Sequence, residues 1–185
     1  MSSGIKIFSY LPNPRVWKSL IAANLCGARV EVVGDEPKNL PNWLWDYDAR
    51  ELTEDDRANS SLIRKGRRGF TNDLYKTDNF LLAHPFGTVP AAFDLKTKSG
   101  IFESNAIMRA VARSGKPNNL YGGDDHAMAS RIDSFLDVNL VFSREHQVYI
   151  LSVEKMNQVL YNRMKSAYEF YFCLLYTSPS PRDNR

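Results

Sequence analysis

The pattern of apolar and polar residues at the start of the chain predicts a strand, a helix and a second strand. Residues 5–8 form a short β-branched and aromatic run, which is typical of a strand. Asn13 and Pro14 predict a helix start, with Asn as N-cap and Pro at the first helical position, and Gly27 predicts its left-handed end. Residues 29–33 alternate charged and apolar side chains, so the three elements form a βαβ unit with a parallel strand pair. The helix carries large apolar residues near helical spacing: Trp17, Leu20, Ile21 and Leu25.

Residues 34–69 break this pattern and are interpreted as a long insertion. The segment mixes prolines, two tryptophans, an acidic stretch over 51–56 and a basic cluster over 64–68. Such a cluster can bind RNA or an acidic partner, but a solvated loop is the interpretation that we favour, so RNA is not indicated as a partner. Trp43 and Trp45 are expected to pack onto the domain.

Regular structure is expected again over residues 77–115. Residues 77–83 predict a short helix, 86–93 a turn that leads into a strand, and 100–102 the second strand of a hairpin. A helix is expected from Ser104 to about Gly115. The order βαβ, helix, ββα predicts a mixed four-stranded sheet with helices on its faces.

Beyond residue 123 the apolar pattern is helical, with long helices expected near 124–147 and 152–172. The predicted domains are 1–115 (α/β), 116–123 (linker) and 124–172 (partial all-α). Residues 173–185 have two prolines and no apolar period. They resemble a translated sequencing adaptor, which predicts a non-native tail and missing later helices, and the alternative is a genuine disordered tail.

Composition and charge narrow the functional classes. Of 185 residues, 43% are hydrophobic and 24% are charged, with a formal net charge of +3, which is too small to imply nucleic acid by itself. No apolar run reaches the roughly 18 residues of a membrane span, and the amino terminus lacks a secretory signal pattern. Cys26 and Cys173 form no disulfide framework. We therefore expect a cytoplasmic protein without a membrane partner.

A first candidate binding motif is Gly-Thr-Val-Pro at residues 87–90. A proline directly before a strand cannot donate to the ladder. If the Val89–Pro90 bond is cis, the backbone amide and carbonyl of Val89 are expected to face outward, where a peptide-like ligand could add as a strand. The alternative is an ordinary turn proline with a trans bond.

A second candidate motif is Glu103-Ser104, where a predicted strand ends and a helix begins. Free backbone N–H groups and the positive end of the helix dipole meet at such a point and favour a carboxylate. The Ser104 hydroxyl adds a donor and Glu103 suits an ammonium group, so the pair predicts a site for an amino-acid end group. The alternative is Ser104 as a plain N-cap and Glu103 as first-turn electrostatics.

Together, residues 85–90 (Pro-Phe-Gly-Thr-Val-Pro) and 102–107 (Phe-Glu-Ser-Asn-Ala-Ile) resemble the amino-terminal domain of the glutathione transferase superfamily. The resemblance implies a thioredoxin-like domain followed by an all-α domain that is incomplete at its C-terminus. In that family the cis-Pro loop pairs with the cysteinyl part of glutathione, and Glu-Ser binds its γ-glutamyl end. The resemblance implies glutathione as substrate or ligand, no metal, and these binding residues: Val89, Pro90, Glu103 and Ser104.

Shorter motifs resemble one branch of that superfamily, the gamma subunit of translation elongation factor 1. They include Ser9-Tyr10, Trp17-Lys18, the Leu-Ile-Ala-Ala run at 20–23 and the residues before the Pro loop. This resemblance implies a part of the nucleotide-exchange complex, with other elongation factor 1 subunits or a second copy (a self-dimer) as partners. The long insertion departs from the branch. The alternative is a catalytic glutathione transferase that conjugates glutathione to electrophiles.

Catalysis would require a group that holds the glutathione thiol, with a free pKa of ~8.5, as a thiolate. The superfamily uses a Tyr or Ser hydroxyl just after the first strand, and Leu11 stands about where the serine would be. Ser9 and Tyr10 are the nearby hydroxyls, and at most one of them can point into the site because strand residues alternate in direction. Asn13 could donate instead, although capping competes. Tyr10 is the preferred candidate, and whether the protein is an enzyme is left open.

Overall fold

The computed structural model of the chain describes residues 4–66, 70, 72–116 and 118–177. The chain divides into two units, Met1–His126 and Ala127–Arg185. Each unit is described by itself. No helix in the described ranges is long and apolar enough to cross a membrane.

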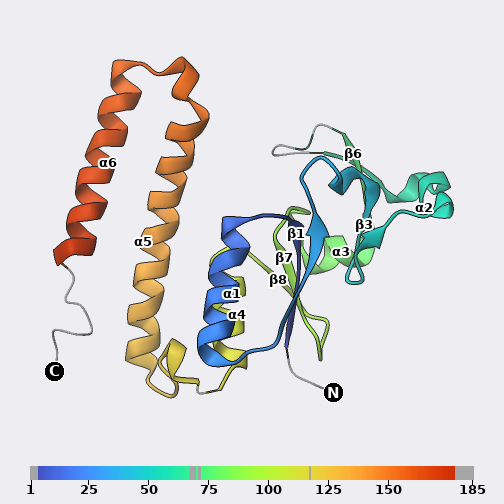
Figure 1. Ribbon diagram of the computed structural model, residues 1–185, viewed down its shortest axis with the longest axis horizontal. Helices are drawn as coiled ribbons and strands as arrows, with labels where there is room; N and C mark the ends of the chain where they lie inside the picture. The colour runs from blue at the N-terminus through green and yellow to red at the C-terminus, as the bar shows by residue number, and fades with distance from the viewer. Residues whose placement is uncertain (1–3, 67–69, 71, 117, 178–185) are drawn as a thin grey trace. The chain divides into compact units, whose positions relative to one another are not determined.

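The first unit is built on a four-stranded sheet of order β2-β1-β7-β8 (Figure 1). Strand β1 (Ile5–Tyr10) pairs in parallel with β2 (Val30–Asp35) and antiparallel with β7 (Ala91–Asp94). Strand β7 pairs antiparallel with β8 (Gly100–Phe102). The predicted mixed sheet is therefore present, and β8 has the bounds that the sequence predicted.

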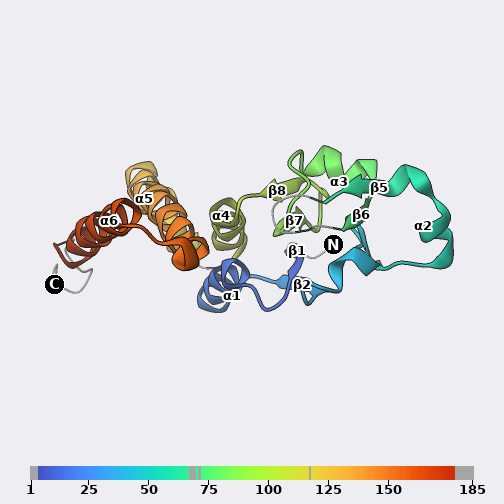
Figure 2. The same cartoon turned by 90° about the horizontal axis from the view of Figure 1, so that it is seen from above.

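Helices α1 (Pro14–Cys26) and α4 (Ser104–Ser114) cover one face of this sheet (Figure 2). The Asn13 side chain accepts a hydrogen bond from the Arg15 amide, and Gly27 ends α1 at φ 66°, as the sequence predicted. The apolar cluster on this face combines both helices with alternate strand residues, among them Ile5, Ile7, Val16, Ala92, Ile107 and Val111. This packing holds the start of α4 at the end of β8.

Helix α3 (Asp78–Ala83) and a second sheet cover the other face. The second sheet has the order β4-β3-β6-β5, with β3 (Trp43–Trp45), β4 (Arg50–Glu51), β5 (Ile63–Lys65) and β6 (Asp73–Lys76). The 3-10 turn η1 (Leu40–Asn42) leads into β3, and the short helix α2 (Glu54–Ala58) and the 3-10 turn η2 (Ser60–Leu62) lie between β4 and β5. Residues 34–69, interpreted from the sequence as a long insertion, thus contain strands and short helices. Trp45 packs with Leu74 and Phe80 against Phe8 and Phe93, as expected for this tryptophan.

Of the basic cluster at 64–68, the structure describes residues 64–66. Arg64 lies in β5, and its guanidinium donates to the carboxylate of Asp78 at 2.9 Å. Lys65 is exposed, and residues 67 and 68 lie outside the described residues. Arg64 is thus engaged with α3, which leaves less free positive charge on this segment than the sequence suggested.

The segment predicted as a linker, 116–123, contains the 3-10 turn η3 (Asn118–Tyr121). The Tyr121 side chain is 7% exposed, and the Arg113 guanidinium lies 4.4 Å from the centre of its ring. The backbone amide of Lys116 donates to the carbonyl of Cys26 at 2.7 Å. The segment therefore packs on the ends of α1 and α4.

The helical part consists of α5 (His126–Leu151), the 3-10 turn η4 (Val153–Lys155) and α6 (Gln158–Thr177). The two helices form a hairpin in which Arg163 donates twice to the Glu145 carboxylate, at 2.5 and 2.8 Å. Helix α6 continues to Thr177 and therefore includes residues 173–177 of the predicted tail. The rest of that prediction, 178–185, lies outside the described residues.

Candidate functional site

The strand register brings the two predicted binding motifs to the same end of the main sheet. Ala91 in β7 stands opposite both Phe8 in β1 and Phe102 in β8. Because β7 is antiparallel to both neighbours, its first residues lie beside the last residues of β1 and β8. The segments 89–90, 103–104 and 9–10 therefore meet at one edge, where the sequence motifs required them.

Val89 and Pro90 lie immediately before β7. Their peptide bond is cis, as the motif predicted. The Val89 side chain is 9% exposed and packs into the cluster around Phe8 and Phe93. Among the described residues, no hydrogen bond engages the Val89 amide or carbonyl. These two backbone groups are therefore available to an extended ligand.

Glu103 and Ser104 form the junction between β8 and α4. Glu103 has φ 66° and ψ 123°, a conformation that L-residues rarely adopt and that is often found at functional sites. The first intrahelical bond runs from the Ile107 amide to the Glu103 carbonyl, so the amides of the first turn point out of the helix. Within the described part of the chain, neither the Glu103 carboxylate nor the Ser104 hydroxyl makes a hydrogen bond. The junction can thus offer an acceptor, a donor and a helix N-terminus together.

Lys18 adds a cation near this junction that sequence reasoning did not identify. Its ammonium group on α1 donates to the Asn105 side-chain oxygen on α4. Burial, followed by the charges of Arg15 and Arg109, lowers the pKa of Lys18 to about 8, while Glu103 opposes that shift. In the sequence, Lys18 stands out only as a charged residue between the apolar residues Trp17 and Leu20 of the predicted helix.

Two buried residues behind the Pro loop were also missed. Lys76 is 6% exposed, and its ammonium group donates to the Gly87 carbonyl at 2.5 Å. His84 is 3% exposed and stacks on Phe80 at 6.0 Å, and its Nδ1 has no hydrogen-bond partner among the described residues. Burial lowers the pKa of His84, which keeps the ring neutral. No local sequence pattern predicts the burial of either side chain.

The three candidate catalytic residues have different surroundings. Ser9 and Asn13 are both fully buried, and the Asn13 amide donates to the Ser9 hydroxyl at 2.9 Å. Since the Asn13 oxygen also caps α1, both polar ends of this side chain are engaged. Tyr10 is partly buried against the aromatic cluster and follows Ser9 at the end of β1. Tyr10 is therefore the candidate of the three that a ligand at the sheet edge could reach.

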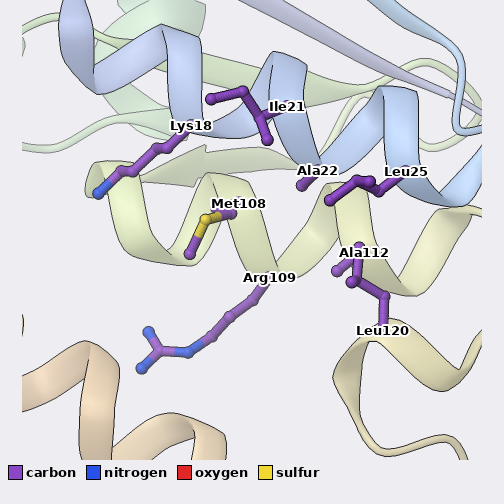
Figure 3. A pocket seen from close by; sticks show the side chains of 8 residues that line it. All are labelled: Lys18, Ile21, Ala22, Leu25, Met108, Arg109, Ala112 and Leu120. Carbon is purple, nitrogen blue, oxygen red and sulfur yellow. The ribbon is translucent and has the colours of Figure 1, made fainter. Parts of the chain in front are cut away.

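A separate apolar groove of about 280 Å³ lies between α1 and α4 (Figure 3). Its lining includes Ile21, Leu25, Met108 and Leu120, together with Lys18 and Arg109. None of the residues predicted to bind glutathione lines it. In the described ranges no group of three or more His, Cys, Asp or Glu side chains could hold a metal ion.

The chain is similar to known proteins in sequence and in fold. The chain is 32% identical over 111 residues to elongation factor 1-gamma 2 of Oryza sativa subsp. japonica, a match that covers 60% of this chain and 18% of that protein. It is similar in structure to a trimeric glutathione transferase of Leishmania (TM-score 0.60, 16% identity, 96% of this chain and 31% of that chain). It is also similar to a theta class glutathione S-transferase of Xanthomonas axonopodis pv. citri with glutathione bound (TM-score 0.52, 20% identity, 94% and 67%). No protein-family model matches the chain.

The structural likeness is at low sequence identity and therefore speaks for the fold alone. The chain has the glutathione transferase fold, a thioredoxin-like domain with a mixed four-stranded sheet followed by helices. The fold that the sequence resemblance implied is confirmed, and the chain is similar in sequence to part of an elongation factor 1 gamma protein.

Proposed function

We propose that this chain is the glutathione-transferase-like part of a translation elongation factor 1 gamma subunit, which binds glutathione and helps to assemble the nucleotide-exchange complex in the cytoplasm. Similarity to the rice protein supports the branch. The main support for glutathione binding is the junction at Glu103-Ser104. Among the described residues, its carboxylate and hydroxyl groups make no hydrogen bond, and neither do the backbone amide and carbonyl of the neighbouring Val89.

The chemistry of this edge matches the ligand. The carboxylate of the γ-glutamyl end would accept from the Ser104 hydroxyl and the first amides of α4, where the helix dipole favours negative charge. Its ammonium group would pair with the Glu103 carboxylate. The cysteinyl backbone would then exchange hydrogen bonds with Val89 in the manner of an added strand. Pro90 lies directly before β7, which begins at Ala91, and so sets where that added strand would lie.

The decisive variant for this site is Ser104→Ala. A hydrogen bond to a charged group contributes ~1.5–3 kcal/mol, so glutathione affinity should fall roughly 10- to 100-fold. Isothermal calorimetry measures the change. Ser114→Ala is the matched control, because this serine lies at the other end of the same helix and donates to Val111. Equal affinity of the Ser104 variant and the unmodified chain would remove Ser104 from the site.

The assembly role predicts stable partners rather than rapid turnover. The purified protein should co-elute with other elongation factor 1 subunits. The competing function, conjugation of glutathione to electrophiles, requires a thiolate-stabilising group, and Tyr10 is the reachable candidate. Rapid conjugation that is lost in Tyr10→Phe, without co-elution, would replace the assembly role with a catalytic one. A homodimer alone in the eluate would identify a second copy as the partner instead.

A further inference from the structure

One buried lysine of the second sheet, Lys76, contacts the Pro loop. Lys76 is the last residue of β6, and its register partner in the parallel strand β3 is Trp45. The ammonium group of Lys76 lies 4.5 Å from the centre of the Trp45 ring. Trp45 is itself fully buried, and its indole N–H donates to the Leu40 carbonyl at 3.2 Å. The ring and the ammonium group therefore form a cation–π contact inside the protein.

The same ammonium group donates a hydrogen bond to the Gly87 carbonyl, at 2.5 Å. Gly87 adopts φ +57°, and its amide donates to the His84 carbonyl at 2.8 Å. A Cβ at this position would lie 3.3 Å from the Lys76 nitrogen and 3.0 Å from a Leu81 methyl group. Both backbone groups of Gly87 are thus held, and the space around it is filled.

Burying the Lys76 ammonium group costs desolvation free energy. Removing an ammonium group from water is unfavourable unless strong hydrogen bonds replace its hydration, and an apolar side chain of similar volume would avoid that penalty. The Lys76 ammonium group binds the carbonyl of Gly87, and the next residues of this loop are Thr88 and Val89. A binding site keeps its geometry when the residues that support it are themselves held by packing and hydrogen bonds, as Lys76 is here.

We propose that Lys76 is a positioning residue for the ligand-binding edge. Its ammonium group, oriented by Trp45, fixes the Gly87 carbonyl and thereby holds the Val89 backbone in place for an incoming peptide-like ligand. Glutathione as that ligand rests on the proposed function, whereas the fixing of the loop does not. The second sheet then supplies the support of the binding loop, in addition to covering the main sheet.

The test compares three variants of the full chain. Lys76→Met removes the charge and the donor at similar length, Lys76→Arg keeps both, and Lys98→Met is the control. Lys98 is an exposed lysine whose ammonium group lies 4.9 Å from the Tyr47 ring centre. It lies in the turn between β7 and β8, at the end of β7 opposite to the Pro loop. Amide hydrogen exchange at Gly87, read by NMR, reports the loop. Calorimetry with reduced glutathione reports the ligand.

We expect Lys76→Met to speed exchange of the Gly87 amide and to weaken glutathione binding, each about tenfold, as for the loss of one hydrogen bond to a charged group. Lys76→Arg should restore most of both, and Lys98→Met should change neither. If Lys76→Met does not fold, Lys76→Gln makes the same comparison with a neutral side chain. Unchanged Gly87 exchange in the neutral variant overturns the proposal, including the case in which glutathione binding alone weakens. If the unmodified chain binds no glutathione, the proposed function fails, and Gly87 exchange still decides the role of Lys76.

Discussion

Ser9 and Asn13 were candidates for stabilising a thiolate, but their side chains form hydrogen bonds in the turn between β1 and α1. The Asn13 amide donates to the Ser9 hydroxyl, and its oxygen caps α1. Neither side chain is exposed. A buried donor that loses its acceptor forfeits its solvation without replacement, so this pair is a stability element of the β1–α1 turn.

Ser9→Ala should therefore act on stability and leave the ligand unaffected. It leaves the buried Asn13 amide without its acceptor, and the free energy of unfolding should fall by ~1–3 kcal/mol. Denaturant unfolding measures the change, and calorimetry should give an unchanged glutathione affinity. Tyr10→Phe is the neighbouring control with little expected effect on stability. A Ser9 variant of normal stability that has lost glutathione binding would return Ser9 to the site.

The sequence predicted some residues of the candidate site and not others. Val89, Pro90, Glu103 and Ser104 were found because their chemistry depends on local chain order, a strand end followed by a helix start. Lys76 and His84 were not found, because their burial depends on Trp45, Phe80 and other residues distant in sequence. The role of the four predicted residues in binding remains a prediction.

Secondary-structure elements likewise divide into those that local sequence signals predict and those that depend on residues distant in sequence. The caps of α1 and the bounds of β8 followed from local signals, namely Asn13-Pro14, Gly27 and the hairpin turn. The second sheet escaped notice because its strands are short and pair across long separations, as Leu44 does with Tyr75. Its stability comes from burial against the main sheet, which no local propensity reports.

One polar cluster in this second sheet predicts a pH dependence. Thr53 and Asp56 form a capping box at α2, and Arg50 donates to both carboxylate oxygens of Asp56, at 2.5 and 3.2 Å. The Arg50 hydrogen bonds, followed by the Thr53 amide, hold the pKa of Asp56 well below its ordinary value. The folded state therefore binds this proton less readily than the unfolded state, so the stabilisation is present above the unfolded pKa of ~3.9 and declines as the pH falls.

Asp56→Asn should lower the free energy of unfolding at neutral pH by ~1 kcal/mol, a modest value because the Arg50 side chain is about half exposed. The difference from the unmodified chain should shrink below pH ~4. Urea unfolding at several pH values measures both. Asp55→Asn, at the exposed preceding residue, is the control. A difference that stays constant or grows on acidification would contradict the assigned ion pair.

At the scale of the whole molecule, apolar side chains are distributed unevenly. The large residues of α1 that the sequence placed near helical spacing are exposed: Trp17, Leu20, Ile21 and Leu25. The smaller residues of that helix, such as Val16 and Ala23, pack on the sheet instead. In α5 and α6, Met164 is the one buried hydrophobic side chain among those described, while Val159, Leu151 and Phe170 are largely exposed. The α/β unit therefore has two clusters of buried side chains, whereas the described part of the helical unit has ring contacts such as that between Phe142 and Tyr168 but one buried hydrophobic side chain.

Native-state hydrogen exchange should reveal this difference. Amides of β1 and β7 lie between two buried clusters and should exchange only through global unfolding. Amides of α5 and α6 should exchange faster, and exposed apolar faces of this extent favour association at high protein concentration. Light scattering over a concentration series is the companion measurement. Equal protection in both units, in a species that stays monomeric, would show that the helical unit is stabilised in a way that its burial does not reveal.

The central claim is that one edge of the main sheet, at Val89, Glu103 and Ser104, is a glutathione site. The most direct test is a titration of the isotopically labelled chain with reduced glutathione, followed by amide NMR. We predict that the largest shifts fall on the amides of Val89 and residues 103–107, which the register brings to the same edge. Absence of shifts up to millimolar glutathione, or shifts confined to the groove between α1 and α4, would contradict the account.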